Sequence, residues 1–373
     1  MIKELKELVS EKFVENLGNA IKKIYKSFRA DKFKENVLET PFLDFPLKQR
    51  IRRITDCLTK FLPLNYKEAV SILQKIHHKF TGLPGLVFPD FVTQNGVSSE
   101  NFIISMLALE NFTIYSSSEF AIRSFILFDQ EKTLKWVKKW SKDPRENVRR
   151  LSSEGIRPRL PWREHIVSFR EDPGPVLEIL ENLMDDPSLF VRKSVGNNLN
   201  DISKDHRDLF YDFAKKWLGY SESADWILKK GARTLLKEKD KEILKLFGYR
   251  PTSAGRKKTI ETINFSVTPE RIKIGEKTEL FYEIESKKEG LVRLEYILRY
   301  PTKGGKHGEK IFFLTEKNLS PKEILKGKRL LTFKDMTIRK QVPGIQELTL
   351  IANGEILGKI TLQLLKRSNK ENS

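Results

Sequence analysis

The chain has a single cysteine, Cys57, among its 373 residues. One cysteine cannot form a disulfide within the chain, and it cannot supply the thiolate set of a structural zinc site. No apolar run approaches the roughly 20 residues that a membrane-spanning helix needs. The first residues, MIKELKELVSEKF, are charged from the start and do not resemble a secretory signal. We therefore expect a cytoplasmic protein.

Signatures of common metal and cofactor sites are also missing. The five histidines, which include the adjacent His77 and His78, have no spacing typical of metal ligands. No Walker, Rossmann or nucleophile-elbow pattern occurs in the sequence. We therefore expect a protein that works without a metal or a cofactor.

Positive charge is what the chain has in excess. Its 69 Lys and Arg against 50 Asp and Glu give a net charge of +19. From Arg256 onward, 25 Lys and Arg face 15 Asp and Glu, so both parts of the chain are basic. Contacts between these side chains and phosphates release counterions, which favours a polyanionic partner such as nucleic acid. A basic surface that only keeps the protein soluble is the alternative, and composition leaves both open.

Residues 1–250 have the pattern of a helical domain. All five tryptophans lie in this part of the chain. Apolar residues recur at three- and four-residue steps, as amphipathic helices require, in Ile2–Phe28, Leu47–Leu62, Tyr66–Phe80 and Leu209–Leu218. We therefore expect an all-α domain.

A repeat lies within this helical part. Asp143-Pro144 followed by Val148-Arg149 matches Asp186-Pro187 followed by Val191-Arg192, 43 residues further on. This offset falls in the range of about 40–47 residues that is typical of HEAT repeats. An Asp followed by Pro also predicts a helix start, with Asp as the N-cap. We expect a HEAT-like solenoid whose core includes Val148, Leu151, Phe190 and Val191.

The rest of the chain has the pattern of β-strands. PTSAGRKK, residues 251–258, is typical of a linker. Alternating, β-branched segments follow within 259–367: Ile263–Val267, Thr278–Glu285, Val292–Tyr300, Lys310–Leu314, Arg329–Phe333, Gln346–Ile351 and Glu355–Leu365. The fold predicted for the whole chain is therefore an all-α HEAT-like repeat solenoid followed by an all-β immunoglobulin-like sandwich.

Two carboxylates occupy similar positions in the two matched repeats. Glu154 follows Asp143 by 11 residues, and Asp201 follows Asp186 by 15. At about 100° per residue their directions differ by only about 40°, so both leave the same side of equivalent helices. Stacking of the repeats is expected to bring the two carboxylates to one surface.

The neighbours of Glu154 allow two interpretations. Gly155 indicates that the helix ends there, where a carboxylate opposes the helix dipole, so its position favours a functional role. The alternative is an ordinary ion pair with Arg150, four residues earlier. Arg150 and Lys193 both lie seven residues after their repeat's aspartate, which gives each repeat a basic residue at an equivalent place.

Two further segments contain candidate residues. Arg157-Pro158-Arg159-Leu160-Pro161-Trp162 predicts an extended connector with two guanidiniums suited to phosphates and an indole that can face a cation. An exposed basic loop that ends in a core Trp is the alternative. Upstream, Glu119 near the start of another helix is either a site acid or the partner of Arg123.

Three segments together resemble the AlkC family, HEAT-like DNA glycosylases related to AlkD. They are SMLALENFTIYSSSEFAIRSFI (Ser105–Ile126), VRRLSSEGIRPRLPW (Val148–Trp162) and VRKSVGNNLNDISKDH (Val191–His206). The resemblance implies removal of small, cationic N-alkylated bases, such as 3-methyladenine and 3-methylcytosine, from double-stranded DNA without base flipping. It also implies that the sandwich grips DNA.

The same resemblance assigns roles to individual residues. It implies that Glu119, Glu154, Trp162 and Asp201 form the active site. It implies DNA contacts by Arg150, Arg157 and Arg159, and extends weakly to Tyr25; Lys193 joins this set through its equivalence to Arg150.

The chemistry fits these residue types. An N-alkylated base is a cation and leaves readily, so the protein has to stabilise an oxocarbenium-like sugar and orient a water molecule. Carboxylates do both in glycosidases. Asp201 and Glu154 are assigned to these two tasks, and which does which stays open. The rival hypotheses are a non-catalytic HEAT-repeat scaffold that binds DNA or an acidic protein and an RNA-binding repeat protein.

Overall fold

The computed structural model describes residues 5–254, 257–335 and 340–367. The chain forms two compact units, Met1–Ala232 and Arg233–Ser373. Each unit is considered separately below.

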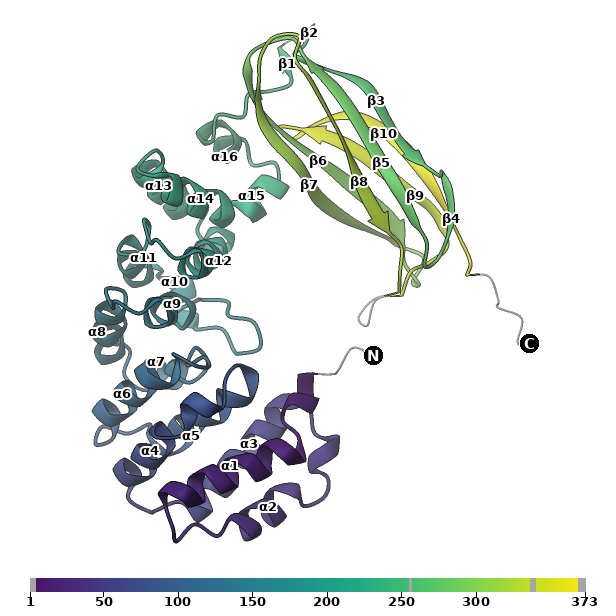
Figure 1. Cartoon of the computed structure of the whole chain (residues 1–373). Helices are drawn as coiled ribbons and strands as arrows, with labels where there is room; N and C mark the ends of the chain where they lie inside the picture. The colour runs from purple at the N-terminus through teal and green to yellow at the C-terminus, as the bar shows by residue number, and fades with distance from the viewer. Residues whose placement is uncertain (1–4, 255–256, 336–339, 368–373) are drawn as a thin grey trace, which may run out of the picture. The chain divides into compact units, whose positions relative to one another are not determined.

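The first unit is a succession of helices stacked side by side in a curved row (Figure 1). This arrangement confirms the predicted helical repeat. Short 3-10 helices lie at Leu5–Leu8, before the first α-helix, and between later α-helices at Phe42–Asp44, His77–Lys79 and Leu83–Leu86. The α-helices are α1 (Glu11–Ile24), α2 (Ala30–Leu38), α3 (Leu47–Phe61), α4 (Tyr66–Gln74), α5 (Val87–Asn95), α6 (Phe102–Phe112), α7 (Ile122–Phe128), α8 (Gln130–Trp140), α9 (Glu146–Glu154), α10 (Val167–Glu171), α11 (Gly174–Glu181), α12 (Leu189–Asp205), α13 (Arg207–Trp217) and α14 (Glu222–Gly231).

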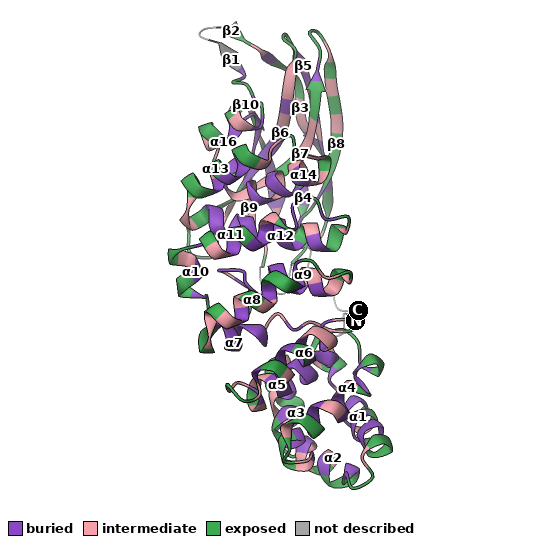
Figure 2. Ribbon diagram, turned by 90° about the vertical axis from the view of Figure 1, so that its left-hand side faces the viewer, coloured by how far each residue is buried: buried purple, intermediate pink, exposed green. Residues whose placement is uncertain are grey.

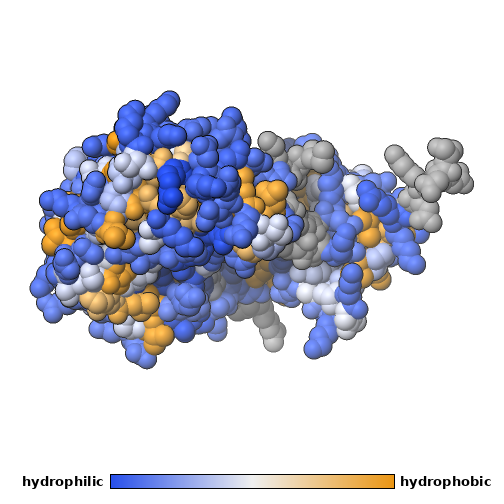
Figure 3. All heavy atoms as spheres, turned by 90° about the horizontal axis from the view of Figure 1, so that it is seen from below, coloured by the Kyte–Doolittle hydropathy of each residue, from blue (hydrophilic) through white to orange (hydrophobic). Residues whose placement is uncertain are grey.

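The helices pack through their apolar faces. Figure 2 shows buried residues on one side of most helices and exposed residues on the other. The face in Figure 3 is mostly hydrophilic, with hydrophobic side chains in separate small groups. Among the described residues, no helix combines the length and the apolar character needed to cross a membrane.

The predicted helix starts at Asp143 and Asp186 were wrong by the same two residues in both repeats. The N-caps are Arg145 and Ser188. Each aspartate instead accepts a 2.8 Å hydrogen bond from the backbone N–H of that cap residue. An Asp side chain often closes such a turn before a helix, which explains why Asp-Pro precedes the helix by one turn.

The two repeats are joined by an ion pair. The Arg149 guanidinium donates to both carboxylate oxygens of Asp186, at 2.6 and 3.1 Å. Helix α9 also packs against α12. The aspartate that starts one repeat therefore anchors the arginine of the preceding one.

Three of the four predicted core residues are buried, namely Val148, Leu151 and Val191. Phe190 is not, because 43% of it is exposed. The guanidinium of Arg150 lies 4.9 Å from the centre of its ring. The core prediction was therefore wrong for Phe190, which contacts a charged side chain.

The second unit begins with α15 (Arg233–Lys237) and α16 (Lys241–Leu246) and continues as two packed sheets. One sheet has the order β4-β10-β9-β6-β7 and the other β3-β5-β8, beside a small β1-β2 pair. The strands are β1 (Ser253–Ala254), β2 (Lys257–Lys258), β3 (Ile260–Thr268), β4 (Arg271–Lys273), β5 (Lys277–Ser286), β6 (Gly290–Pro301), β7 (His307–Leu319), β8 (Ile324–Thr332), β9 (Gly344–Ala352) and β10 (Glu355–Leu365).

All seven predicted strands are present, which confirms the sandwich. Leu280 from one sheet and Leu298, Leu348 and Leu362 from the other are buried in a common core. Asn353 and Gly354 have φ values of 47° and 85° and form the tight turn between β9 and β10. Two consecutive positive φ values are typical of a type I′ hairpin, which an Asn-Gly pair favours.

The segment after α16 packs against the sandwich. Tyr249 pairs with Leu291 in an isolated bridge, and its hydroxyl donates to Glu316 Oε2 at 2.5 Å. Residues 255–256 of the predicted linker lie outside the described residues. The division into 1–250, 251–258 and 259–367 remains our proposal for the functional domains.

Candidate active site

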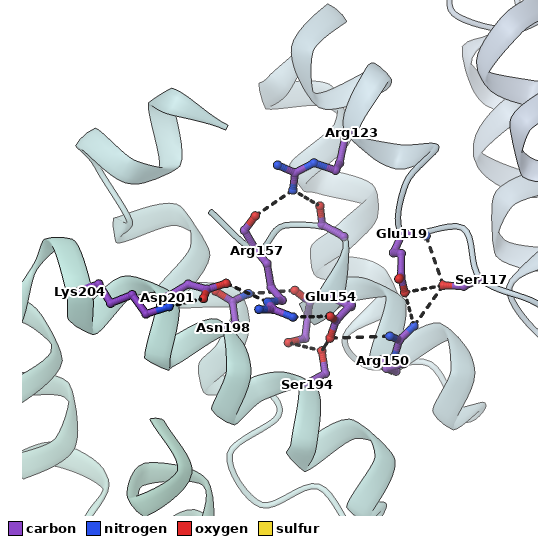
Figure 4. A network of polar contacts seen from close by, with 12 residues as sticks. Ser117, Glu119, Arg123, Arg150, Glu154, Arg157, Ser194, Asn198, Asp201 and Lys204 are labelled. Carbon is purple, nitrogen blue, oxygen red and sulfur yellow. Dashed lines mark hydrogen bonds and ion pairs between the residues drawn. The ribbon is translucent and has the colours of Figure 1, made fainter. Parts of the chain in front are cut away.

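Glu154 and Asp201 are brought together by one arginine (Figure 4). Arg157 donates from Nη1 to Glu154 Oε1 at 2.6 Å and from Nε to Asp201 Oδ2 at 2.9 Å. The two carboxylates come from α9 and α12, and Arg157 comes from the connector that follows α9. Stacking of the repeats brings the two acids close together, as expected, but not to one surface, because both side chains are buried.

Local backbone structure places Glu154 at the very end of its helix. Gly155 is the C-cap of α9. A Cβ atom at Gly155 would lie 2.5 Å from Cγ2 of Ile122, so only glycine permits this approach to α7. The chain can therefore turn directly after Glu154, and Arg157 folds back toward its carboxylate.

The three charged groups are almost fully removed from solvent. The side chain of Asp201 is 2% exposed, and those of Glu154 and Arg157 are each 8% exposed. Burial by itself would lower the pKa of the Arg157 guanidinium, but Glu154 and Asp201 outweigh it and raise the pKa above its ordinary value. Arg157 therefore stays charged, as a cation between two buried acids must.

Serine and amide groups complete the surroundings of Glu154. Ser194 Oγ donates to Glu154 Oε2 at 2.6 Å, and it lies 3.0 Å from Ser153 Oγ. Asn198 donates to the carbonyl oxygen of Ser153 at 2.9 Å. Sequence reasoning missed Ser194, although it lies two helical turns before Asp201 and so on the same side of α12.

Glu119 belongs to a second cluster beside the first. Arg150 Nη1 donates to Glu119 Oε2 at 2.5 Å, and Ser117 Oγ donates to the same oxygen at 2.6 Å. Arg150 Nη2 is 3.8 Å from Glu154 Oε2, so the predicted i,i+4 pair is present but is the longer of its two ion pairs. Arg150 thus links Glu119 to Glu154.

Arg123 is not the partner of Glu119, so that alternative was wrong. Its buried guanidinium donates to the carbonyl oxygens of Gly155 (3.4 Å), Arg157 (2.8 Å) and Glu164 (2.6 Å). Burial lowers the pKa of Arg123 to about 10, assisted by repulsion from Arg163. Arg123 therefore fixes both ends of the connector, and sequence reasoning missed this role.

Trp162 is held out of the core. It is 55% exposed, so the alternative of a core Trp was wrong. Its φ of 68° is rare for a bulky residue, which marks a constrained loop. The Lys48 ammonium donates to its carbonyl oxygen.

A cavity of about 370 Å³ lies beside Trp162, and we refer to it as the acidic cavity. Among its lining residues, the charged ones are Glu119, Glu154 and Arg150, which leave a net charge of −1. Ser117, Phe120 and Leu86 also line it. Asp201 does not, so three of the four predicted active-site residues meet here and the fourth lies behind Arg157.

The predicted DNA-contacting residues differ in exposure and in whether they are already paired within the chain. Arg159 donates to Asp205 at 2.9 and 2.5 Å, and Arg157 is buried, so neither guanidinium is held ready for a phosphate. Lys193 is exposed on α12. Tyr25 is the C-cap of α1, outside the polar network of Figure 4. Their roles toward DNA remain predictions.

No group of three or more His, Cys, Asp or Glu in the described ranges could hold a metal ion.

Comparisons with known proteins agree with this architecture. A family model described as DNA alkylation repair enzyme matches residues 109–235, and another, described as the C-terminal Ig-like domain of uncharacterised protein YhaZ, matches residues 261–366. Uncharacterized protein YhaZ of Bacillus subtilis (strain 168) is 42% identical over 361 residues, 97% of this chain and 99% of that protein.

A solved structure gives the same result. It is Pseudomonas fluorescens alkylpurine DNA glycosylase AlkC bound to DNA containing an abasic site analog, with a TM-score of 0.88 and 32% identity. The match covers 97% of this chain and 100% of that chain. Fold and site thus define a helical-repeat protein with a carboxylate site and a C-terminal immunoglobulin-like sandwich. The chain belongs to the AlkC family of DNA alkylation repair enzymes.

Proposed function

We propose that this chain is a monofunctional DNA glycosylase of base excision repair. Its substrates are cationic N-alkylated bases of the 3-methyladenine and 3-methylcytosine class in double-stranded DNA, and it removes them without base flipping. The observation that carries the proposal is the position of Glu154, whose fixed carboxylate lines the acidic cavity beside Trp162. The net charge of +19 and the AlkC relative bound to DNA support DNA as the partner.

The acidic cavity suits a cationic base and a developing sugar cation. In the reaction the glycosidic bond breaks, the base leaves with the electron pair, and a water oxygen adds to C1′ while losing a proton. A carboxylate held in place by hydrogen bonds stabilises the oxocarbenium-like sugar and orients that water. Glu154 takes this role in our proposal, because it both lines the cavity and is fixed by Arg157 and Ser194.

Other residues support Glu154 in this proposal. Glu119 adds negative charge to the same cavity, and the exposed Trp162 ring attracts the charged base through cation–π interaction. Asp201 is a positioning residue, since it contacts Arg157 and does not line the cavity. No metal or cofactor is required for these steps.

The test is release of free base from alkylated DNA by the full chain. We expect Glu154→Gln to lower the single-turnover rate by about 10²-fold, because it removes the charge and keeps the size, while DNA affinity changes little. Glu178→Gln is the matched control, since Glu178 is exposed on α11 and pairs with Lys138. Equal rates of base release for Glu154→Gln and the native chain would overturn the role of Glu154, and no release by the native chain would leave the non-catalytic DNA-binding scaffold as the explanation.

A further inference from the structure

A second cavity also has Trp162 in its lining. Its volume is about 270 Å³, and we refer to it as the basic cavity. It shares Trp162, Phe120, Leu86 and Ser117 with the acidic cavity, so the two are neighbours. Its remaining walls come from α3, α5, Ala121 and the residue after Trp162.

The charges of this cavity are opposite to those of the acidic cavity. Its charged lining residues are Lys48, Arg52, Arg163 and Asp90, which leave a net charge of +2. Arg52 Nη2 lies 2.9 Å from Asp90 Oδ1, so these two charges offset each other. Lys48 and Arg163 supply the uncompensated positive charge.

Both of these cations are available to an anion. Arg163 makes no hydrogen bond or ion pair with any part of the chain that the structure describes, and its guanidinium lies 5.9 Å from the ring centre of Phe120. Lys48 is exposed, and its ammonium donates to a neutral carbonyl oxygen, that of Trp162. An anion placed between Lys48 and Arg163 would therefore meet two charged donors.

Apolar and aromatic side chains form much of the rest of the basic cavity, beside the polar Gln49, Thr93 and Ser117. Leu47, Ile51, Leu86, Pro89 and Phe120 line it together with Trp162. A protein cavity of about 150 Å³ is large enough for benzene, so 270 Å³ has room for a bicyclic base. Aromatic walls also bind bases by stacking, without regard to sequence.

We propose that the basic cavity binds one nucleotide, with its base against Trp162 and Phe120 and its phosphate between Lys48 and Arg163. A cationic alkylated base is repelled by a net charge of +2, so the lesion itself does not occupy this cavity. The nucleotide is a neighbour of the lesion in the DNA, and to that extent the inference rests on the proposed function. Trp162 then lines both a site for a cation and a site for an anion.

The experiment measures direct binding to the full chain by calorimetry, with dAMP, deoxyadenosine and inorganic phosphate as separate probes. We expect dAMP to bind at least tenfold more tightly than either of its parts, because base and phosphate are recognised together. Phosphate binding as tightly as dAMP would show an anion site only, and deoxyadenosine binding as tightly as dAMP would show an apolar slot only. Either result, or no binding of dAMP, overturns the inference.

Variants locate the bound nucleotide. Arg163→Gln is expected to weaken dAMP binding about tenfold, which is the size of one charge-assisted contact. Arg163 repels Arg123 and attracts Asp90, and these two effects oppose each other, so we expect Arg163→Gln to fold. Lys60→Gln is the matched control, because Lys60 is an exposed residue of α3, outside the lining of the cavity. If both variants bind dAMP as the native chain does, the nucleotide lies elsewhere and the proposal is wrong.

A last pair of measurements separates this inference from the proposed function. A duplex with an abasic-site analogue should displace dAMP; failure to displace it would mean that DNA is not the source of the nucleotide. Glu154→Gln should lower the rate of base release about 10²-fold and leave dAMP binding intact. Base release by the native chain without dAMP binding would overturn only the nucleotide site, and dAMP binding without base release would overturn only the glycosylase proposal.

Discussion

Glu154 and Asp201 belong to different helical repeats, yet both accept hydrogen bonds from a single guanidinium, that of Arg157. The arrangement places two negative charges and one positive charge in a largely dry environment. The stability of the folded chain therefore depends on the Arg157 guanidinium.

We expect Arg157→Met to lower the free energy of unfolding by about 3–5 kcal/mol, because it removes the closest cation from two buried carboxylates. Glu154 then keeps only the longer pair with Arg150, at 3.8 Å, and Asp201 the longer pair with Lys204, at 3.4 Å, among the residues that the structure describes. Urea unfolding monitored by circular dichroism measures the change. The double variant Arg157→Met with Asp201→Asn replaces one of those carboxylates by a neutral amide. Part of the lost free energy of unfolding should therefore be recovered. Strictly additive effects of the two substitutions would contradict the coupling.

Asp205 predicts a pH dependence of stability. Hydrogen bonds from Arg159 and then Arg170 hold the pKa of this carboxyl well below its ordinary value, despite the opposing effect of burial. Because the folded-state pKa is depressed, the stabilisation is present above the unfolded-state pKa of about 3.9 and is lost as pH falls below it. We expect Asp205→Asn to cost about 1–2 kcal/mol at pH 7 and progressively less below pH 4.

Urea unfolding at pH 7, 5 and 3.5 checks this prediction. Asp212→Asn serves as the control, because Asp212 is 73% exposed and lies 3.7 Å from Lys215. A difference between native chain and Asp205→Asn that stays constant over the three pH values would exclude the proposed linkage.

The loop between β6 and β7 predicts a salt dependence of DNA binding. Thr302 donates from its backbone N–H to the carbonyl oxygen of Lys306 at 2.8 Å, and Lys303 and Lys306 are exposed in this turn. If both lysines contact phosphates, changing both to Gln should reduce the slope of log affinity against log salt by about two. Lys328→Gln is the control, because Lys328 already pairs with Glu279 at 2.9 Å. An unchanged slope would show that this loop serves another purpose.

The acidic cavity predicts the range of lesions. With a net charge of −1 and an exposed Trp, it attracts cationic alkylated bases, so these should be excised. Neutral lesions such as uracil and 8-oxoguanine should not be, since their glycosidic bonds are less labile and they gain no charge attraction. Duplexes with one lesion each, assayed for strand scission after alkaline treatment, provide the measurement. Efficient cutting at uracil would contradict the electrostatic basis of selectivity.

Much of the fold was predictable because its signals are local. Alternation of apolar residues predicted seven strands, and all seven are present in the structure. Asn353-Gly354 forms the hairpin between β9 and β10, as the turn residues predicted. The matching Asp-Pro segments located the repeat, although the helices begin two residues later than predicted. That error arose because an aspartate before a helix closes a turn as readily as it caps.

The active site was predictable only in part. Helical periodicity alone indicated that Glu154 and Asp201 leave the same side of α9 and α12, and it could equally have indicated Ser194. Nothing in the sequence showed that Arg123 would bind carbonyl oxygens of the connector instead of Glu119. A buried arginine with several acceptors within reach is assigned its partner by packing.

The sequence by itself determined the helices, the strands, the repeat and the side of the helix on which each acid lies, since these depend on residues within a few turns of one another. Only the tertiary structure decided that Arg157 is buried between the acids, that Phe190 and Trp162 are exposed, and that two cavities of opposite charge share Trp162 in their linings. These features depend on contacts such as that of Lys48 with Trp162, between segments distant in the sequence. Such contacts are set by how the helices pack, and no local pattern of residues contains that information.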